Sequence, residues 1–342
     1  MEKAGQHILV IRFSALGDVA MTVPVLKILL AQNPSLKITF LSTPFVAPFF
    51  KDIDRLYFFG INVKDYKGIA GIYKLSKKIK KDIPFTAIAD LHNVVRTKLL
   101  RFFLANKNTA TIDKGRNEKK QLTQPSHKNL HQLKTVFQRY ADVFLKLGLP
   151  LELTKEKGVT HVSPNKLLLP FIKHNHEKII GIAPFAKHAA KMYPLKKMVE
   201  VIKILLADAE NKILLFGTAS EMAQLDNTIF NNPNIFSMAG RLSFADELNV
   251  ISQLDVMLSM DSANMHFASL YGVSVVSIWG GTHPYLGFNG WGQHEKNILQ
   301  TDLPCRPSSV FGNKPCPVHG VAGCMQDITP QMVVQKVQEV LS

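Results

Sequence analysis

The chain has 342 residues, of which 46% are hydrophobic, enough for the cores of one large or two ordinary domains. No apolar run reaches the roughly 18 residues that a membrane-spanning helix needs, and the first seven residues lack the long apolar region of a signal peptide. We therefore expect a cytoplasmic protein without a transmembrane segment.

The positive charge is concentrated in the first half of the chain. The net charge is +15; residues 1–170 contain 28 Lys and Arg against 12 Asp and Glu, whereas residues 171–342 contain 13 against 14. This asymmetry indicates that the first half binds something anionic, such as nucleic acid, a membrane surface or a phosphorylated substrate. The alternative is a basic surface that serves only solubility.

Strand-like and helix-like patterns alternate along the first half of the chain. Unbroken apolar runs predict buried parallel strands at residues 8–13, 37–41, 55–59, 85–90 and 108–112. Helical spacing of apolar residues predicts helices at 18–31, 69–81 and 129–147. Residues 114–128 are polar and basic, so we expect an exposed loop there.

The pattern then restarts. Strands are expected at 178–185, 212–217, 255–260 and 273–280, and helices after Pro194 and at 219–230, 262–272 and 330–341. Repeated strand–helix units indicate right-handed crossovers and doubly wound parallel sheets. We predict two Rossmann-like α/β domains that face a cleft, residues 1–165 and 175–328, with the helix at 330–342 packing back on the first. Ligands should bind at the carboxyl ends of the strands.

The first strand leads into "SALGD", which places the carboxylate of Asp18 at the start of a helix. Asp18 is either the N-cap residue of that helix or a group in a ligand site. The turn lacks the G-x-G-x-x-G of dinucleotide-binding proteins, and the chain has no P-loop, so an NAD enzyme is disfavoured.

The stretch "MDSANMH" predicts an anion site, because the backbone N–H groups of residues 262–264 would point out of a helix N-terminus. His266 could donate to a phosphate oxygen, and Lys191 could add a second positive charge. The alternative is that Asp261 or Ser262 only caps the helix, that His266 packs in the core and that Lys191 is solvated.

Three cysteines lie within twenty residues near the C-terminus. With His319, residues Cys305, Cys316 and Cys324 could surround a zinc ion, but their spacing contains no C-x-x-C pair. The odd number also argues against a set of structural disulfides. We expect thiols in a loop, without metal.

Five motifs together resemble glycosyltransferase family 9, the heptosyltransferases of lipopolysaccharide synthesis. They are "ILVIRFSALGDVAMTVP", "DLHNVVRTKLL" with Arg96, "KMYP", "GTASE" and "MDSANMHFASLYGVSVVSIWGGTHP". The chain departs from the family pattern at Ala263, where glycine is usual, and at Ser274 and Gly281, where proline is common. Ser308 occupies the second position of a four-cysteine segment found in many relatives.

The resemblance implies a GT-B fold and an inverting glycosyltransferase of the hexosyl or heptosyl class, with no cofactor and no catalytic metal. It implies transfer of a sugar, heptose from ADP-heptose, to a lipopolysaccharide core or similar anionic glycolipid at the cytoplasmic face of the inner membrane. Asp18 would be the general base, and Lys191 would stabilise the leaving group. Donor binding falls to Glu221, Asp261, Ser262, Ala263, His266 and Thr282, and acceptor binding to Ser14, Gly17 and Arg96. From the positive charge of the first half, we expect Lys119 and Lys120 of the 114–128 loop to bind the acceptor as well.

Two other functions remain open at this point. A nucleotide-sugar epimerase or hydrolase of the same fold would turn over its substrate without an acceptor. A nucleic-acid-binding protein would also be basic, but the chain has no helix-turn-helix, RNA-binding or zinc-finger signature.

Overall fold

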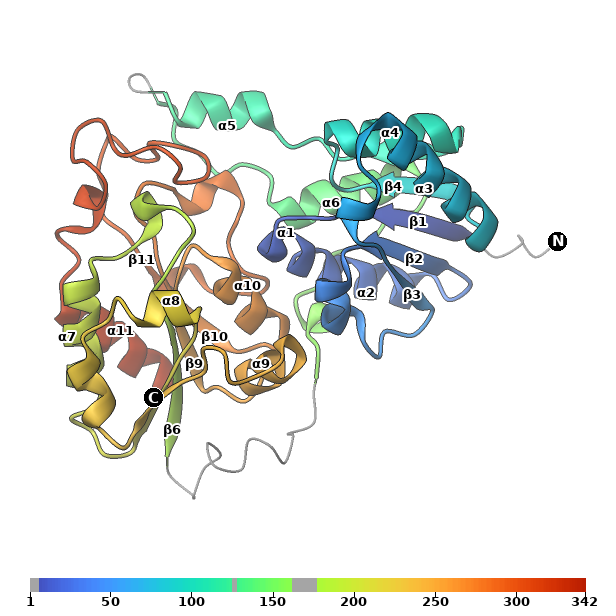
Figure 1. Cartoon of the computed structure of the whole chain (residues 1–342). Coiled ribbons are helices and arrows are strands. Elements are labelled where there is room, and N and C mark those ends of the chain that lie inside the picture. The colour runs from blue at the N-terminus through green and yellow to red at the C-terminus, as the bar shows by residue number, and fades with distance from the viewer. Residues whose placement is uncertain (1–5, 125–127, 162–176) are drawn as a thin grey trace. The chain divides into compact units, whose positions relative to one another are not determined.

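The computed structural model describes residues 6–124, 128–161 and 177–342. These residues form two α/β units (Figure 1). The first unit comprises Met1–Lys114 and Val136–Gly158, and the second comprises Gly115–Thr135 and Val159–Ser342. By sequence, the first unit has 22 Lys and Arg against 11 Asp and Glu, and the second has 19 against 15. The first unit is therefore the more basic one, as expected.

The first unit is built on a five-stranded parallel sheet in the order β3-β2-β1-β4-β5. Its central strand β1 is apolar and buried along almost its whole length, as a strand covered on both faces must be. All five expected strands are confirmed, with bounds that differ by at most two residues. They are β1 (His7–Ile11), β2 (Lys37–Ser42), β3 (Leu56–Gly60), β4 (Ala87–Asp90) and β5 (Thr109–Thr111).

The described helices of the first unit pack apolar faces on this sheet. In one core, Ile72, Leu75 and Ile79 of α3 lie against Ile11 and Ile88. The α-helices are α1 (Leu16–Ala20), α2 (Thr22–Gln32), α3 (Gly68–Asp82), α4 (Val95–Leu104) and α6 (Val136–Lys146). Shorter 3-10 turns are η1 (Pro44–Phe50), η2 (Val63–Asp65) and η3 (Glu156–Gly158).

Two predicted helices differ from the structure. The helix expected at 18–31 is divided at Met21 into α1 and α2, because Pro24 lacks the N–H that one continuous helix would need and is tolerated in the first turn of a new one. The helix expected at 129–147 begins only at Val136. Before it, the N–H of Leu133 donates to the carbonyl of Tyr285 at 3.0 Å, so this stretch pairs with the second unit instead.

The second unit is built on a six-stranded parallel sheet in the order β11-β10-β9-β6-β7-β8. Four of these strands were expected, and β8 and β11 were not, because they are only three and two residues long. The strands are β6 (Lys178–Ala183), β7 (Asn211–Leu215), β8 (Ile235–Ser237), β9 (Val256–Met260), β10 (Ser274–Ile278) and β11 (Ile298–Leu299).

Helices flank this sheet in the second unit. They are α5 (Arg116–Leu122), α7 (Leu195–Leu205), α8 (Ala219–Met222), α9 (Phe244–Ile251), α10 (Ala263–Leu270) and α11 (Pro330–Leu341). Shorter turns are η5 (Ala189–Lys191), η6 (Asn227–Asn231), η7 (Pro284–Leu286), η8 (Glu295–Asn297) and η9 (Gly323–Met325). The helix expected at 219–230 is thus replaced by α8 and η6.

The C-terminal helix α11 belongs to the second unit. Its Val333 and Val337 are fully buried in one core with Met198 and Ile202 of α7, and the two helices lie side by side (Figure 1). The expectation that residues 330–342 pack on the first domain is therefore wrong, because the apolar face of α11 is covered by α7 and the sheet of its own unit.

The basic segment at 114–128 is also different from the exposed loop expected. Most of its described part forms α5, which packs on the second unit: Leu122, Leu133 and Leu286 form a buried cluster. The Lys119 ammonium lies 4.0 Å from the centre of the Phe288 ring, and the residue is 6% exposed. In the part of the chain that is described, no helix is both long and apolar enough to cross a bilayer.

Candidate functional site

Asp18 lies just after the carboxyl end of β1, in the first turn of α1. The N-cap residue of α1 is Ala15, so the interpretation of Asp18 as the N-cap is wrong. Asp18 is three residues further on, and its Oδ2 accepts the N–H of Ala15 at 3.1 Å. The same oxygen is 2.7 Å from Nη2 of Arg12, and the Asp18 side chain remains 29% exposed.

Arg12 is a site residue that the sequence analysis missed. It is 5% exposed, and it also donates from Nη1 to the carbonyl of Leu91 at 2.5 Å. Tyr140 completes the arrangement, because its hydroxyl donates to the backbone oxygen of Asp18 at 3.0 Å. A buried guanidinium needs a paired carboxylate, so the Asp18 side chain is held in one orientation. The sequence signal that could have identified Arg12 is its position directly after the apolar run of residues 8–11, where a charged side chain needs a partner.

His92 lies beside this pair and was also missed. Its Nδ1 accepts the N–H of Phe13 at 3.5 Å, so Nε2 carries the proton and faces the Ser14 hydroxyl at 3.4 Å. Burial and the charge of Arg12 lower the pKa of His92 to about 4. The imidazole is therefore a neutral hydrogen-bond donor at physiological pH.

The structure brings four of the predicted residues to one edge of the first sheet. Ser14, Gly17 and Asp18 follow β1, and Arg96 lies near the start of α4, where its charge acts on His92. Lys119 and Lys120 are not part of this group, because α5 belongs to the second unit.

The second unit has its own polar group after the carboxyl ends of β9 and β10. Lys191 Nζ is 2.7 Å from Oδ2 of Asp261, and the Thr282 hydroxyl donates to the same oxygen at 2.8 Å. Asp261 and Thr282 are buried, and the Lys191 side chain is 15% exposed. Lys191 is therefore not a solvated loop lysine; it is held beside the start of α10.

The N-terminus of α10 is not capped by a side chain. Ser262 is the N-cap residue, but its hydroxyl bonds to that of Ser259 at 3.1 Å, and the Asp261 carboxylate bonds to Lys191 and Thr282. The alternative in which one of these side chains only caps the helix is therefore wrong. Ala263 is the first residue of α10, and His266 lies in the same helix, 8% exposed.

Glu221 has a local structural role. Its Oε2 accepts the N–H of Thr218 at 2.7 Å and the Thr218 hydroxyl at 2.9 Å, which closes a capping box at the start of α8. The predicted contact of Glu221 with a donor sugar remains a prediction.

Arg306 is a further residue that the sequence analysis missed. Its guanidinium donates to the carbonyls of Gly280 at 2.6 Å, Trp279 at 3.1 Å and Thr282 at 2.9 Å. Burial lowers the pKa of Arg306 to about 10, so it stays charged at pH 7. Arg306 fixes the backbone of the loop that presents Thr282 to Asp261.

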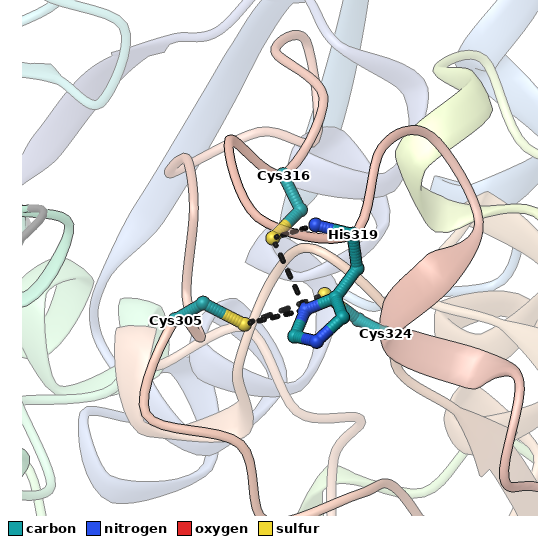
Figure 2. Close-up of side chains that lie close together, drawn as sticks. All are labelled: Cys305, Cys316, His319 and Cys324. Carbon is teal, nitrogen blue, oxygen red and sulfur yellow. Dashed lines mark hydrogen bonds between the residues drawn. The ribbon is translucent and has the colours of Figure 1, made fainter.

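The residues of the candidate zinc site lie together as well. The ligand atoms of Cys305, Cys316, His319 and Cys324 are all within 4.8 Å of one another (Figure 2). Ser308 is outside this group, and its hydroxyl donates to the carbonyl of Gly281 at 3.2 Å.

The candidate site of the second unit therefore combines two features that suit an anion: a helix N-terminus and a fixed lysine. Residues 72–318 match the family model of glycosyltransferase family 9, the heptosyltransferases. This chain belongs to glycosyltransferase family 9. The matched range includes Arg96 of the first unit and Lys191, Asp261 and Thr282 of the second, whereas Ser14, Gly17 and Asp18 precede it.

Curated relatives of this family 9 chain include lipooligosaccharide heptosyltransferase 2 from two strains of Campylobacter jejuni. They are 25% and 26% identical over 176 and 178 residues, covering 50% of this chain and 54% of each relative. The chain thus spans about half the length of the curated relatives it matches.

Solved structures of family 9 members are similar over the whole chain. The E. coli ADP-heptose lipopolysaccharide heptosyltransferase II aligns with a TM-score of 0.68 and 18% identity over 98% of both chains. The family 9 glycosyltransferase of Veillonella parvula aligns with a TM-score of 0.76 and 16% identity, over 100% of this chain and 98% of that one. Together with the two parallel sheets, these similarities confirm the GT-B fold class.

Proposed function

We propose that this protein is an inverting glycosyltransferase that moves a heptose from ADP-heptose to a lipopolysaccharide core or a related anionic glycolipid. The observation that carries the proposal is the fixed Lys191–Asp261–Thr282 group beside the uncapped start of α10. Family membership and the names of the similar proteins support the same activity.

The second unit would bind the donor. The diphosphate would accept hydrogen bonds from the backbone N–H groups at the start of α10, next to Ala263. Lys191 would neutralise the negative charge that develops on the leaving group, and Asp261 would hold its ammonium in place. His266 and Glu221 would complete the donor site. These groups supply the electrostatic stabilisation without a catalytic metal.

The first unit would supply the base. Arg12 and the Ala15 N–H both engage Oδ2 of Asp18, which leaves Oδ1 as the oxygen to accept the acceptor hydroxyl proton. Attack by that hydroxyl on the anomeric carbon, from the face opposite the diphosphate, inverts its configuration. Ser14, Gly17 and Arg96 would bind the acceptor beside the base.

Peripheral membrane contact would use α3 and α4, which pack side by side (Figure 1). On these helices, Tyr73 is 47% and Phe102 is 75% exposed, and the lysines at 74, 77, 78, 80 and 81 are exposed. Exposed aromatic rings beside lysines suit an anionic bilayer surface. The natural chain should co-sediment with vesicles that contain anionic lipid and not with neutral vesicles. A double variant, Phe102→Ser with Lys77→Ala, should bind the anionic vesicles less. Equal binding of the natural chain to both kinds of vesicle would refute this contact.

The test of the function is a transfer assay with a panel of nucleotide-sugars and a purified core acceptor. The proposal predicts a product heavier than the acceptor by one heptose, formed only when ADP-heptose and acceptor are both present. Turnover of the nucleotide-sugar without acceptor would indicate the epimerase or hydrolase, and salt-sensitive binding of bulk DNA or RNA without transfer would indicate the nucleic-acid-binding protein.

A further inference from the structure

The loop between β11 and α11 gathers three thiols and one imidazole (Figure 2). Cys305 Sγ is 3.3 Å from Nδ1 of His319 and 3.9 Å from Sγ of Cys324, and Cys316 Sγ is 3.8 Å from the same Nδ1. Cys316 and Cys324 are buried, Cys305 is half-buried and His319 is exposed. Figure 2 shows all four groups pointing to one centre.

The backbone of the loop is shaped to hold these groups. Cys316 and Gly320 exchange two backbone hydrogen bonds of 3.0 and 2.9 Å, which closes a tight turn. Within this turn the N–H of His319 donates to Cys316 Sγ at 3.4 Å, a contact that favours a thiolate. At Gly323 a Cβ atom would lie 2.3 Å from that of His319, so only glycine allows the turn bearing Cys324 to come this close.

We propose that Cys305, Cys316, His319 and Cys324 bind one Zn²⁺ as a closed structural site. Three sulfur ligands and one nitrogen ligand form the kind of tetrahedral set that zinc prefers. Ions such as Mg²⁺ prefer oxygen ligands and do not suit this set. His319 supplies the fourth ligand in place of a fourth cysteine. Because the protein provides all four ligands, the ion has no open position for substrate.

The site would support the donor-binding group of the second unit. Arg306, next to Cys305, donates to carbonyls of residues 279–282. Gly312 lies against Lys191, since a Cβ there would be 2.5 Å from Lys191 Cγ. Lys128 donates to the carbonyls of Cys305 at 2.5 Å and Pro307 at 3.0 Å, and so ties the segment after α5 to the same loop. Zinc would therefore fix the loop that positions Lys191 and Thr282, a consequence that rests on the proposed function.

The test measures metal directly in the purified full-length chain, after brief chelator treatment and desalting. Elemental analysis should find about one zinc per chain, and replacement with Co²⁺ should produce the strong visible absorption of tetrahedral cobalt with thiolate ligands. A thiol reagent should react slowly with the native protein and quickly with three thiols once the metal is removed.

Variants test the ligand set. After dialysis against a chelator, the zinc content of Cys316→Ser and of His319→Asn should be about tenfold or more below that of the natural chain. His294 is exposed and lies outside the cluster, so His294→Asn should keep the zinc content of the natural chain. If a variant fails to fold, the metal content and cobalt spectrum of the natural chain still decide the question.

Three results would overturn the proposal. One is a purified chain without stoichiometric metal. A second is a Cys305–Cys324 disulfide found by mass spectrometry. A third is iron in place of zinc, which would refute the choice of ion. None of these readouts depends on sugar transfer, so failure of the zinc site and failure of the proposed function are separate outcomes.

Discussion

Lys191 and Asp261 form an ion pair of 2.7 Å in the second unit, and Thr282 donates to the same carboxylate oxygen at 2.8 Å. Asp261 is 4% exposed, so its carboxylate is stabilised by the Lys191 ammonium and the Thr282 hydroxyl rather than by water. The pair fixes a positive charge at the start of α10, where the proposed diphosphate would bind. Asp261 is thereby a positioning residue for Lys191.

Removal of the Lys191 charge should reduce turnover strongly. For Lys191→Met we expect kcat to fall by about 10²–10³-fold, as when one preorganised donor to a developing charge is lost. Affinity for ADP, measured by calorimetry, should fall as well. Lys187→Met is the matched control, because Lys187 is exposed and only four residues away. Equal behaviour of the two variants would show that Lys191 does not act on the leaving group.

Asp18→Asn should abolish most turnover while leaving ADP affinity intact. Because the buried Arg12 guanidinium loses its carboxylate, the variant should also have a lower free energy of unfolding, so turnover is compared where both proteins are folded. General-base catalysis contributes about 10²–10⁴-fold, and the amide cannot accept the proton. The comparison is Asp52→Asn, an exposed carboxylate of the same unit. Near-normal kcat for Asp18→Asn would show that Asp18 is not the general base and only binds Arg12 and the Ala15 N–H.

Lys119 and Lys120 should separate into different roles, although they are neighbours in α5. Lys119→Ala should destabilise the second unit by about 0.5–2 kcal/mol, because the buried ammonium lies over the Phe288 ring. Lys120→Ala should change the free energy of unfolding by less than about 0.5 kcal/mol, since Lys120 is exposed. Denaturant unfolding of both variants measures the difference. A Lys119→Ala variant as stable as the natural chain would contradict the packing role.

Stability should depend on pH through His92. In the unfolded chain a histidine takes up its proton near pH 6.5, but in the fold the pKa of His92 is about 4. Between these values the unfolded state binds more protons, so the free energy of unfolding falls as pH decreases. His92→Gln should show a shallower decline between pH 7 and pH 5 than the natural chain, whereas the exposed His294→Gln should not differ. Parallel curves for His92→Gln and the natural chain would refute a neutral, half-buried His92 in the folded protein.

The sequence predicts the strands well, because the central ones are unbroken apolar runs such as residues 8–11 and 213–216. It also places Asp18, Asp261 and Ser262 at strand ends, since parallel topology brings these ends to one edge of each sheet. What it misses depends on contacts between distant segments. The sequence places Arg12 in a strand and Arg306 in a loop, but it does not predict their hydrogen bonds to the carbonyls of Leu91 and Thr282, respectively. It also predicts α5 as an exposed loop, because only folding brings Phe288 to Lys119. The cysteine spacing does not predict that Cys305, Cys316, Cys324 and His319 meet, since backbone hydrogen bonds such as those between Cys316 and Gly320 set the turns of this loop.

The most direct measurement is the anomeric configuration of the product formed from ADP-heptose and a core acceptor, with divalent ions held at trace level by a chelator. We expect one heptose per acceptor, with the configuration at the anomeric carbon opposite to that of the donor, at a rate unchanged by added Mg²⁺ or Mn²⁺. Retention of configuration, or a rate that requires either ion, would contradict this prediction.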